Sequence, residues 1–328
     1  MPKFSVIVPV YNRPDEITEL LESLCFQSNK DFEVLILEDN SPNKCDKVVE
    51  SFKDRLDVRY FFIPGTDRSY RRNYGMEQAK GEYFILYDSD CVIPSGYFDA
   101  VEAGLNAEPA DCFGGPDNAD DSFTDLQKAV NYSMTSFFTT GGIRGGAKQM
   151  EKYNPRSFNM GISRKAFEVT KGFRSMIGED IDFSLRVREN GMETKLYRDA
   201  FVYHKRRVSL RRFYLQVNTF GKSRIVLTNA HPGSLKLVHT LPVFFVLGHV
   251  LLLIFAIFRS PLWLLLIVFY AMLLFIDSWI KNKRLKIALL SIASAYTQLC
   301  GYGMGFLNEL FTRRASRKLK DQESIYQP

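Results

Sequence analysis

Two aspartates one residue apart, Asp88 and Asp90, are the residues in this sequence best placed to do chemistry. They end an apolar, aromatic-rich run that begins at Gly81 and is typical of a strand buried on both faces. Two carboxylates this close repel each other unless a cation lies between them, and hard divalent cations prefer oxygen ligands. The pair therefore predicts a metal site at the carboxyl end of a strand, where open α/β sheets bind ligands. A simple turn is the structural alternative.

Other polar side chains follow their own strands in the same way. Asn12 comes at the end of the apolar run 4–11, and Asp39 follows the run 32–37. Because the carboxyl ends of parallel strands meet at one edge of a sheet, we expect these side chains to lie near the aspartate pair.

A further group of carboxylates, Glu179, Asp180 and Asp182, follows Gly178 at the start of a helix expected to end near Asn190. Negative charge at a helix N-terminus is stabilised by the helix dipole, which is the structural explanation for all three. A catalytic role for one of them is the functional alternative.

The elements that must position these residues alternate between strand and helix patterns. The predicted strands are 4–11, 32–37, 58–63 and the run from Gly81 that ends in the aspartate pair, and the helical patterns between them are 13–26, 48–52 and 70–80. This alternation implies parallel pairing through right-handed crossovers, hence a doubly wound α/β sheet. Residues 117–152 have no such pattern and are expected to form long loops. A short helix at 164–170 and a strand at 200–203 follow.

The charge of the chain is divided between its two parts. Residues 1–203 hold 25 Lys and Arg against 33 Asp and Glu, a net −8, whereas residues 204–328 hold 18 against 4, a net +14. The basic residues flank long apolar runs, which favours anionic lipid over nucleic acid as a partner. The five scattered cysteines favour a reducing compartment.

The C-terminal part predicts a membrane region. Runs 237–258 and 261–280 are each long enough to cross a bilayer and form a predicted hairpin. The third apolar segment, 287–311, is interrupted by polar residues and glycines. If it crossed the membrane completely, the basic tail 312–328 would lie outside, against the positive-inside rule. We therefore expect two crossings and a re-entrant or interfacial third segment, with the N-terminal part in the cytoplasm. A basic amphipathic segment, 206–230, is expected in the headgroup layer, an ordinary surface helix being the alternative.

Five motifs occur in a recognisable order: Pro9-Val10-Tyr11-Asn12, Glu38-Asp39-Asn40-Ser41, Arg72-Asn73-Tyr74-Gly75, Asp88-Ser89-Asp90 and Gly178-Glu179-Asp180-Ile181-Asp182. Together they resemble the family 2 glycosyltransferases of GT-A fold, over about residues 4–225. The resemblance implies a catalytic domain at 1–205 with a Rossmann-like, mostly parallel sheet, followed by the all-α membrane region. It also implies inverting transfer of a sugar from a nucleotide-diphospho-sugar, aided by Mn²⁺ or Mg²⁺.

The resemblance implies a role for each motif residue. Asp180 resembles the catalytic base, in preference to Asp182, with Glu179 on the acceptor side. Asp90 and Asp88 resemble metal ligands; His204 is either a further ligand or a structural histidine. Arg68 and Arg71 are candidates for donor phosphate contact, with a solvated face as the alternative. The residues similar to the family's donor-binding set are Pro9, Tyr11, Asn12, Asp39, Arg72, Asp88 and Ser89.

Processive members of the family carry Gln-x-x-Arg-Trp, whereas this chain has Gln216-Val217-Asn218-Thr219-Phe220. The absence of the Arg and the Trp favours transfer of a single sugar over synthesis of a polymer. We expect transfer from a donor, UDP-linked in the first instance, to a lipid-linked or cell-envelope glycan acceptor at the cytoplasmic face of the inner membrane. A polyprenyl-phosphate glycosyltransferase is the alternative within the enzyme class, and a non-catalytic nucleotide-sugar-binding protein is the distant one.

Overall fold

The computed structural model describes residues 1–118, 123–141, 153–205 and 208–325, with side chains to residue 313. The chain divides into two compact units. We call residues 1–121 with 151–205 the sheet unit, and residues 122–150 with 206–328 the helical unit. The sheet unit ends at Lys205, and it leaves out the segment 122–150 that interrupts it in sequence.

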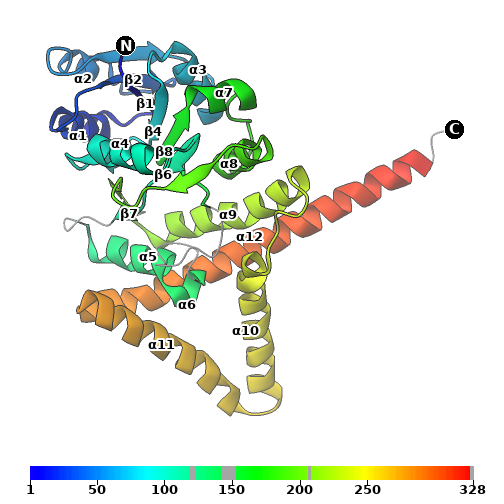
Figure 1. Ribbon diagram of the computed structural model, residues 1–328. Coiled ribbons are helices and arrows are strands. Elements are labelled where there is room, and N and C mark those ends of the chain that lie inside the picture. The colour runs from blue at the N-terminus through cyan, green and yellow to red at the C-terminus, as the bar shows by residue number, and fades with distance from the viewer. Residues whose placement is uncertain (119–122, 142–152, 206–207, 326–328) are drawn as a thin grey trace. The chain divides into compact units, whose positions relative to one another are not determined.

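A seven-stranded, mostly parallel sheet forms the centre of the sheet unit (Figure 1). Its order is β3 (Val58–Phe62), β2 (Phe32–Glu38), β1 (Phe4–Val10), β4 (Tyr83–Tyr87), β8 (Asn159–Ser163), β6 (Cys112–Gly114) and β9 (Thr194–Leu196). The first four strands are parallel, β8 runs antiparallel to both neighbours, and β6 and β9 are parallel. The predicted fold class is confirmed.

Helices cover both faces of this sheet (Figure 1). One core packs under α1 (Pro14–Cys25), α2 (Asp46–Glu50) and α4 (Tyr97–Ala107), and the other under α3 (Arg68–Gln78), α7 (Arg164–Thr170) and α8 (Glu179–Glu189). Strand β1 shows why both faces are apolar: Phe4, Val6 and Val8 enter the first core, whereas Ile7 enters the second.

The strand order reverses between β1 and β4, and the sheet opens there at its carboxyl edge. The β1–β4 ladder ends at the pair Ile7–Leu86. The Val10 carbonyl accepts a hydrogen bond from the Asp39 N–H, on the side of β2. Because the backbone polar groups of successive residues point to opposite sides of a strand, those of Pro9 point toward β4. Proline has no N–H to continue that ladder, so the strands part where a doubly wound sheet binds its ligands.

A second, small sheet lies beside this edge. It consists of β5 (Cys91–Val92), β10 (Val202–His204) and β7 (Asp117–Asn118), with β10 in the middle. The antiparallel β5–β10 pairing sets His204 opposite Cys91, one residue after Asp90. A residue more than 100 positions later in the chain is thereby brought to the aspartate pair.

The expectation of long loops between 117 and 152 is wrong for its central part, where α5 (Asp125–Thr135) and α6 (Phe137–Thr140) form. Thr124 and Gln127 make a complete capping box that starts α5. Val130 of α5 packs against Phe213 in the helical unit, a contact that local periodicity does not reveal. Residues 119–122 and 142–152 lie outside the described part of the chain.

The helical unit also contains α9 (Leu210–Ala230), α10 (Leu241–Phe258), α11 (Leu264–Asn282) and α12 (Leu285–Ile325), with short 3₁₀ turns at Leu237–Thr240 and Pro261–Trp263. Within the described residues, the spans Leu237–Phe258 and Pro261–Asn282 are long and apolar enough to cross a membrane. The third apolar segment falls in α12, which packs along α9, so the apolar face of the basic segment 206–230 is covered by protein. Its first two residues lie outside the described part.

Glycines allow the helices of this unit to approach closely. A Cβ added at Gly221 of α9 would lie 2.1 Å from the Tyr302 carbonyl oxygen, and one at Gly305 of α12 would lie 2.1 Å from the Asn218 carbonyl oxygen. One at Gly303 would lie 2.5 Å from the Pro242 carbonyl oxygen of α10. The glycine cluster in the third apolar segment therefore fits α12 against two other helices.

Replacing Gly305 by alanine should lower the stability of the helical unit by about 1–3 kcal/mol, because backbone rather than a flexible side chain must move to admit the methyl group. Thermal unfolding of the full chain in detergent measures the effect. Gly248→Ala, in α10, is the matched control, since nothing lies within 4 Å of its added Cβ. Equal unfolding midpoints for the two variants would contradict the packing argument.

Candidate active site

Arg72 is the buried centre of the candidate site. Its side chain is fully buried, with Nη2 lying 3.3 Å from Asp88 Oδ1 and Nη1 donating to Glu179 Oε1 at 2.8 Å. The Phe173 ring lies 5.6 Å from the guanidinium carbon. One cation thus joins α3, the end of β4 and the start of α8, which explains how two segments about 90 residues apart meet.

The three carboxylates at the start of α8 each contact a different arginine. Gly178, with φ of +84°, turns the chain into the helix. Glu179 binds Arg72, and Asp182 is fully buried against Arg186, whose Nε donates to it at 2.9 Å. The Asp180 carboxylate remains 16% exposed, accepting from Arg156 Nη1 at 3.3 Å.

The second aspartate of the pair, Asp90, lies in a separate cluster. Its Oδ1 is 3.2 Å from His204 Nε2, and His204 Nδ1 is 3.9 Å from Asp117 Oδ2. The Phe158 ring stacks on His204 with centroids 4.5 Å apart, which fixes the plane of the imidazole.

Ligand atoms from Asp90, Cys91 and His204 lie within 4.8 Å of one another. A carboxylate oxygen and an imidazole nitrogen form a donor set that suits Mn²⁺. Burial strongly raises the pKa of the Cys91 thiol, which donates to the Phe158 carbonyl at 3.5 Å, so its sulfur remains a thiol. The fit to a divalent cation therefore depends on Asp90 and His204.

Asp39 forms the third part of the edge. Its Oδ2 lies 2.6 Å from Arg71 Nη1, and its Oδ1 accepts the backbone N–H groups of Asn40 and Gly65. Partial burial acts to raise the pKa of Asp39, but these hydrogen bonds outweigh it and hold the pKa below its usual value. Asp39 is therefore a charged acceptor at neutral pH.

The remaining donor-site candidates differ in exposure. Tyr11 is exposed, whereas Pro9 is buried inside β1. Asn12 adopts φ of +54°, and its side-chain oxygen accepts from both nitrogens of Asn43. The Ser89 hydroxyl donates to Glu16 Oε2 at 2.9 Å, which ties the turn to α1.

Arg68 lies within the electrostatic field of the whole cluster. The charge of Asp88, and then those of Glu179, Asp90 and Asp180, raise the pKa of its guanidinium. Arg68 is nevertheless exposed, unlike Arg71 and Arg72. An exposed cation beside four carboxylates is placed to meet an anionic ligand.

Three contact residues were not among those predicted from the sequence: Asp117, Phe158 and Arg156. The strand-end rule identifies Asp117 in retrospect, because it follows the apolar run at 112–114. No local pattern marks Arg156 or Phe158, which lie in the short stretch before β8.

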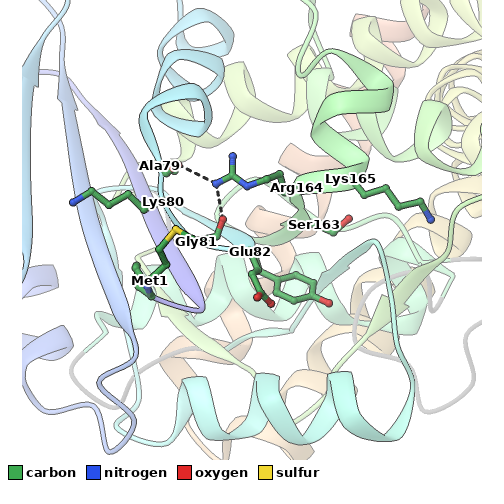
Figure 2. Close-up of a pocket in the computed structure, with 10 residues that line it drawn as sticks. Met1, Ala79, Lys80, Gly81, Glu82, Ser163, Arg164 and Lys165 are labelled. Atoms are coloured by element: carbon green, nitrogen blue, oxygen red, sulfur yellow. Dashed lines mark hydrogen bonds between the residues drawn. The ribbon is translucent and has the colours of Figure 1, made fainter.

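The pocket in Figure 2, with a volume of about 520 Å³, lies elsewhere in the sheet unit. It is at the amino ends of β1 and β4, lined by Met1, Lys80 and Gly81 among others. Arg164 Nη2 donates there to the carbonyls of Ala79 and Gly81, a structural tie between α3 and β4. The edge with the carboxylates is the opposite one, so we do not assign the chemistry to this pocket.

An open α/β sheet with these acidic side chains at its carboxyl edge is the GT-A architecture. The same fold occurs in the mannosyltransferase PcManGT from Pyrobaculum calidifontis, solved in complex with GDP-Man and Mn²⁺, with a TM-score of 0.65 at 15% identity over 90% of this chain and 87% of that one. The sequence model of Glycosyl transferase family 2 matches residues 5–170, and the chain belongs to this family.

Curated relatives match only in part. The GalNAc(5)-diNAcBac-PP-undecaprenol beta-1,3-glucosyltransferase of Campylobacter jejuni is 32% identical over 121 residues, 35% of this chain and 38% of the relative. The poly(ribitol-phosphate) beta-N-acetylglucosaminyltransferase TarS of Staphylococcus aureus is 38% identical over 98 residues, 27% of this chain and 16% of the relative. An uncharacterized glycosyltransferase of Rickettsia felis is 36% identical over 103 residues, 31% of this chain and 17% of the relative. This chain therefore spans well under half the length of these relatives.

Replacing Arg72 by methionine should destabilise the sheet unit by about 2–3 kcal/mol, because it leaves the carboxylates of Asp88 and Glu179 facing each other without their cation. We place the loss near the lower end of values for buried pairs because both carboxylates are partly exposed. Arg174→Met is the control: that side chain is 58% exposed and lies 3.5 Å from Asp182. Thermal unfolding that shows the same midpoint for both variants would contradict the central role of Arg72.

Proposed function

We propose that this chain is an inverting glycosyltransferase that moves one sugar from a nucleotide-diphospho-sugar, UDP-linked in the first instance, to a hydroxyl of a lipid-linked or cell-envelope glycan acceptor. The observation that carries the proposal is the arrangement at one sheet edge: Arg72 links Asp88, on the donor side, to Glu179, the neighbour of the partly exposed Asp180. Such an arrangement supplies separate groups for the leaving group and for the attacking hydroxyl.

The donor side is assigned to the edge formed by β1, β2 and β4. The charged Asp39 accepts a hydrogen bond from the nucleotide base, and the exposed Tyr11 lies at the end of β1. Arg68 is an exposed cation in the field of the four carboxylates, and we assign the contact with the diphosphate to it. Arg71 is held by Asp39 and the Thr66 carbonyl, so its role is to orient Asp39.

Asp90 and His204 would hold a Mn²⁺ or Mg²⁺, with Asp88 beside them. A divalent cation at this position supplies Lewis-acid stabilisation of the charge that develops on the departing diphosphate.

Asp180 is assigned as the general base. Inversion by direct displacement requires a base on the acceptor side to take the hydroxyl proton as the oxygen attacks the anomeric carbon. Asp182 does not meet this requirement, because it is fully buried and held by Arg186. Asp180 is the exposed carboxylate of the two and lies at the helix N-terminus, where it is available to the acceptor.

The helical unit supports an amphiphilic acceptor. We place its two apolar spans in a membrane, with the sheet unit on the cytoplasmic face, because Lys283, Arg284 and Lys286 follow the second span. The name of the Campylobacter relative specifies a diphospho-undecaprenol acceptor, which is consistent with this placement. Transfer to polyprenyl phosphate itself is the second candidate.

Incubation of the purified chain with radiolabelled nucleotide sugars tests the proposal. We expect label on a polyprenyl-diphosphate sugar and none on bare polyprenyl phosphate; the reverse result would select the second candidate. Asp180→Asn should lose at least about 100-fold in turnover, because a general base contributes about 10²–10⁴-fold. Donor affinity, measured by calorimetry, should be unchanged in this variant. Full turnover by Asp180→Asn would refute the assignment of the base.

Asp90→Asn should abolish the dependence of donor affinity on Mn²⁺, because the amide removes the charge that attracts the cation. Calorimetric titration of the donor with and without Mn²⁺ measures this. Asp111→Asn, a carboxylate in the same unit but away from the edge, is the matched control and should behave as the unaltered chain. A metal dependence equal to that of the control would count against the metal role.

A further inference from the structure

The ion pair between Arg156 and Asp180 has a consequence for the acceptor. Arg156 Nη1 donates to Asp180 Oδ2 at 3.3 Å, while the other carboxylate oxygen, Oδ1, accepts from the Ile181 N–H at 2.8 Å. Both oxygens of the assigned base are therefore engaged by donors. While Arg156 occupies Oδ2, that oxygen is not open to the hydroxyl group of an acceptor.

The position of Arg156 is built into the fold. Arg188, near the end of α8, donates to the Tyr153 carbonyl at 3.1 Å and to Asn154 Oδ1 at 2.7 Å. The Arg156 carbonyl accepts from the Asn159 N–H at 2.8 Å, at the start of β8. Asp180 lies in the first turn of α8, and Arg188 lies in its last turn. The same helix therefore carries the assigned base and holds the backbone just before Arg156 in place.

Arg156 differs from Arg72 and Arg186, two of the other arginines that contact this helix turn. Arg72 is fully buried between two carboxylates, and Arg186 is 6% exposed and also donates to the carbonyls of Thr170 and Gly172. The Arg156 side chain is 28% exposed, and among the described residues its one hydrogen-bond acceptor is Asp180. Of these three arginines, Arg156 is therefore the one that is partly open to solvent and able to exchange its partner, and it is the one that contacts Asp180.

We propose that Arg156 binds a phosphate on the acceptor, close to the reacting hydroxyl, and in doing so moves its guanidinium from Asp180 to that phosphate. The inference rests on the proposed function, in which Asp180 is the base. A phosphate offers the planar guanidinium two oxygens in place of one, so it competes with the single contact to Asp180. Release of the guanidinium leaves Asp180 Oδ2 open to the reacting hydroxyl at the moment when the acceptor is in place.

The reaction balances with these groups alone. The acceptor O–H proton passes to Asp180, the acceptor oxygen forms a bond to the anomeric carbon, and the bonding electron pair of the broken C–O bond leaves with the nucleoside diphosphate. An acceptor without phosphate leaves Arg156 on Asp180, so it should react slowly even when it binds.

Two matched pairs of acceptors test this with the whole 328-residue chain in detergent. The first pair is a polyprenyl-diphosphate monosaccharide and a neutral alkyl glycoside of the same sugar; the second is a polyol phosphate and the free polyol. We expect the unaltered chain to prefer the phosphate member of one pair by about 10- to 100-fold in kcat/KM, the range expected for a hydrogen bond to a charged group. The pair that reacts identifies whether the phosphate belongs to a lipid or to a polyol.

Arg156→Gln should remove this preference. Its kcat/KM should fall about 10- to 100-fold with the phosphate acceptor and should not fall with the neutral one, because Asp180 Oδ2 is then open to either acceptor. Arg156→Lys should recover part of the preference through its single ammonium group. Arg174→Gln, an exposed arginine beside Asp182 on the same helix turn, is the control and should keep the full preference.

Equal losses with both members of a pair in Arg156→Gln would overturn the inference, because a structural role lowers both rates alike. A chain that shows no preference for phosphate would also overturn it, while transfer itself would still support the proposed function. Absence of transfer to every acceptor, with the donor bound, would instead refute the proposed function.

Discussion

The fully buried Arg72 is the interaction on which the site depends. Burying a guanidinium is costly unless it is paired, and this one is paired twice, with Asp88 and with Glu179. Without Arg72, the carboxylates of Asp88 and Glu179 would repel each other. The guanidinium neutralises this repulsion and thereby holds the end of β4 against the start of α8. Removing the arginine would separate the donor side of the edge from the assigned base.

The backbone prepares the space that these side chains occupy. The strand order reverses between β1 and β4, and Pro9 has no N–H to prolong the ladder beyond Ile7. The antiparallel β8 then leads the chain back on the other side of β4, so that α7 and α8 cover the same face as α3. Residues from strands that are distant in sequence therefore meet at one edge, which is the general reason why such edges bind ligands.

The helical unit follows a different packing rule. Its α9 and α12 meet backbone to backbone at Gly221 and Gly305, and polar contacts add to this, such as the Tyr132 hydroxyl that donates to Asp277 Oδ2 at 2.7 Å. Tyr132 belongs to α5, which interrupts the sheet unit in sequence and packs with α12. The sequence of the segment 122–150 did not indicate α5 and α6, because their apolar residues pack against helices much later in the chain.

The sequence by itself determined the alternation of strands and helices, the sheet class, the two apolar spans and the acidic strand ends, because each of these depends on local periodicity or on a residue's place at the end of its own run. The family resemblance was also available from the motifs. Only the tertiary structure decided which charge meets which: Arg72 with Glu179 across 107 residues, Arg156 with Asp180, and His204 with Asp90. It also decided that Asp182 is buried and Asp180 is not, since neighbouring positions on a helix turn face different surroundings. Such pairings depend on how separate elements pack, and no spacing within a single element contains that information.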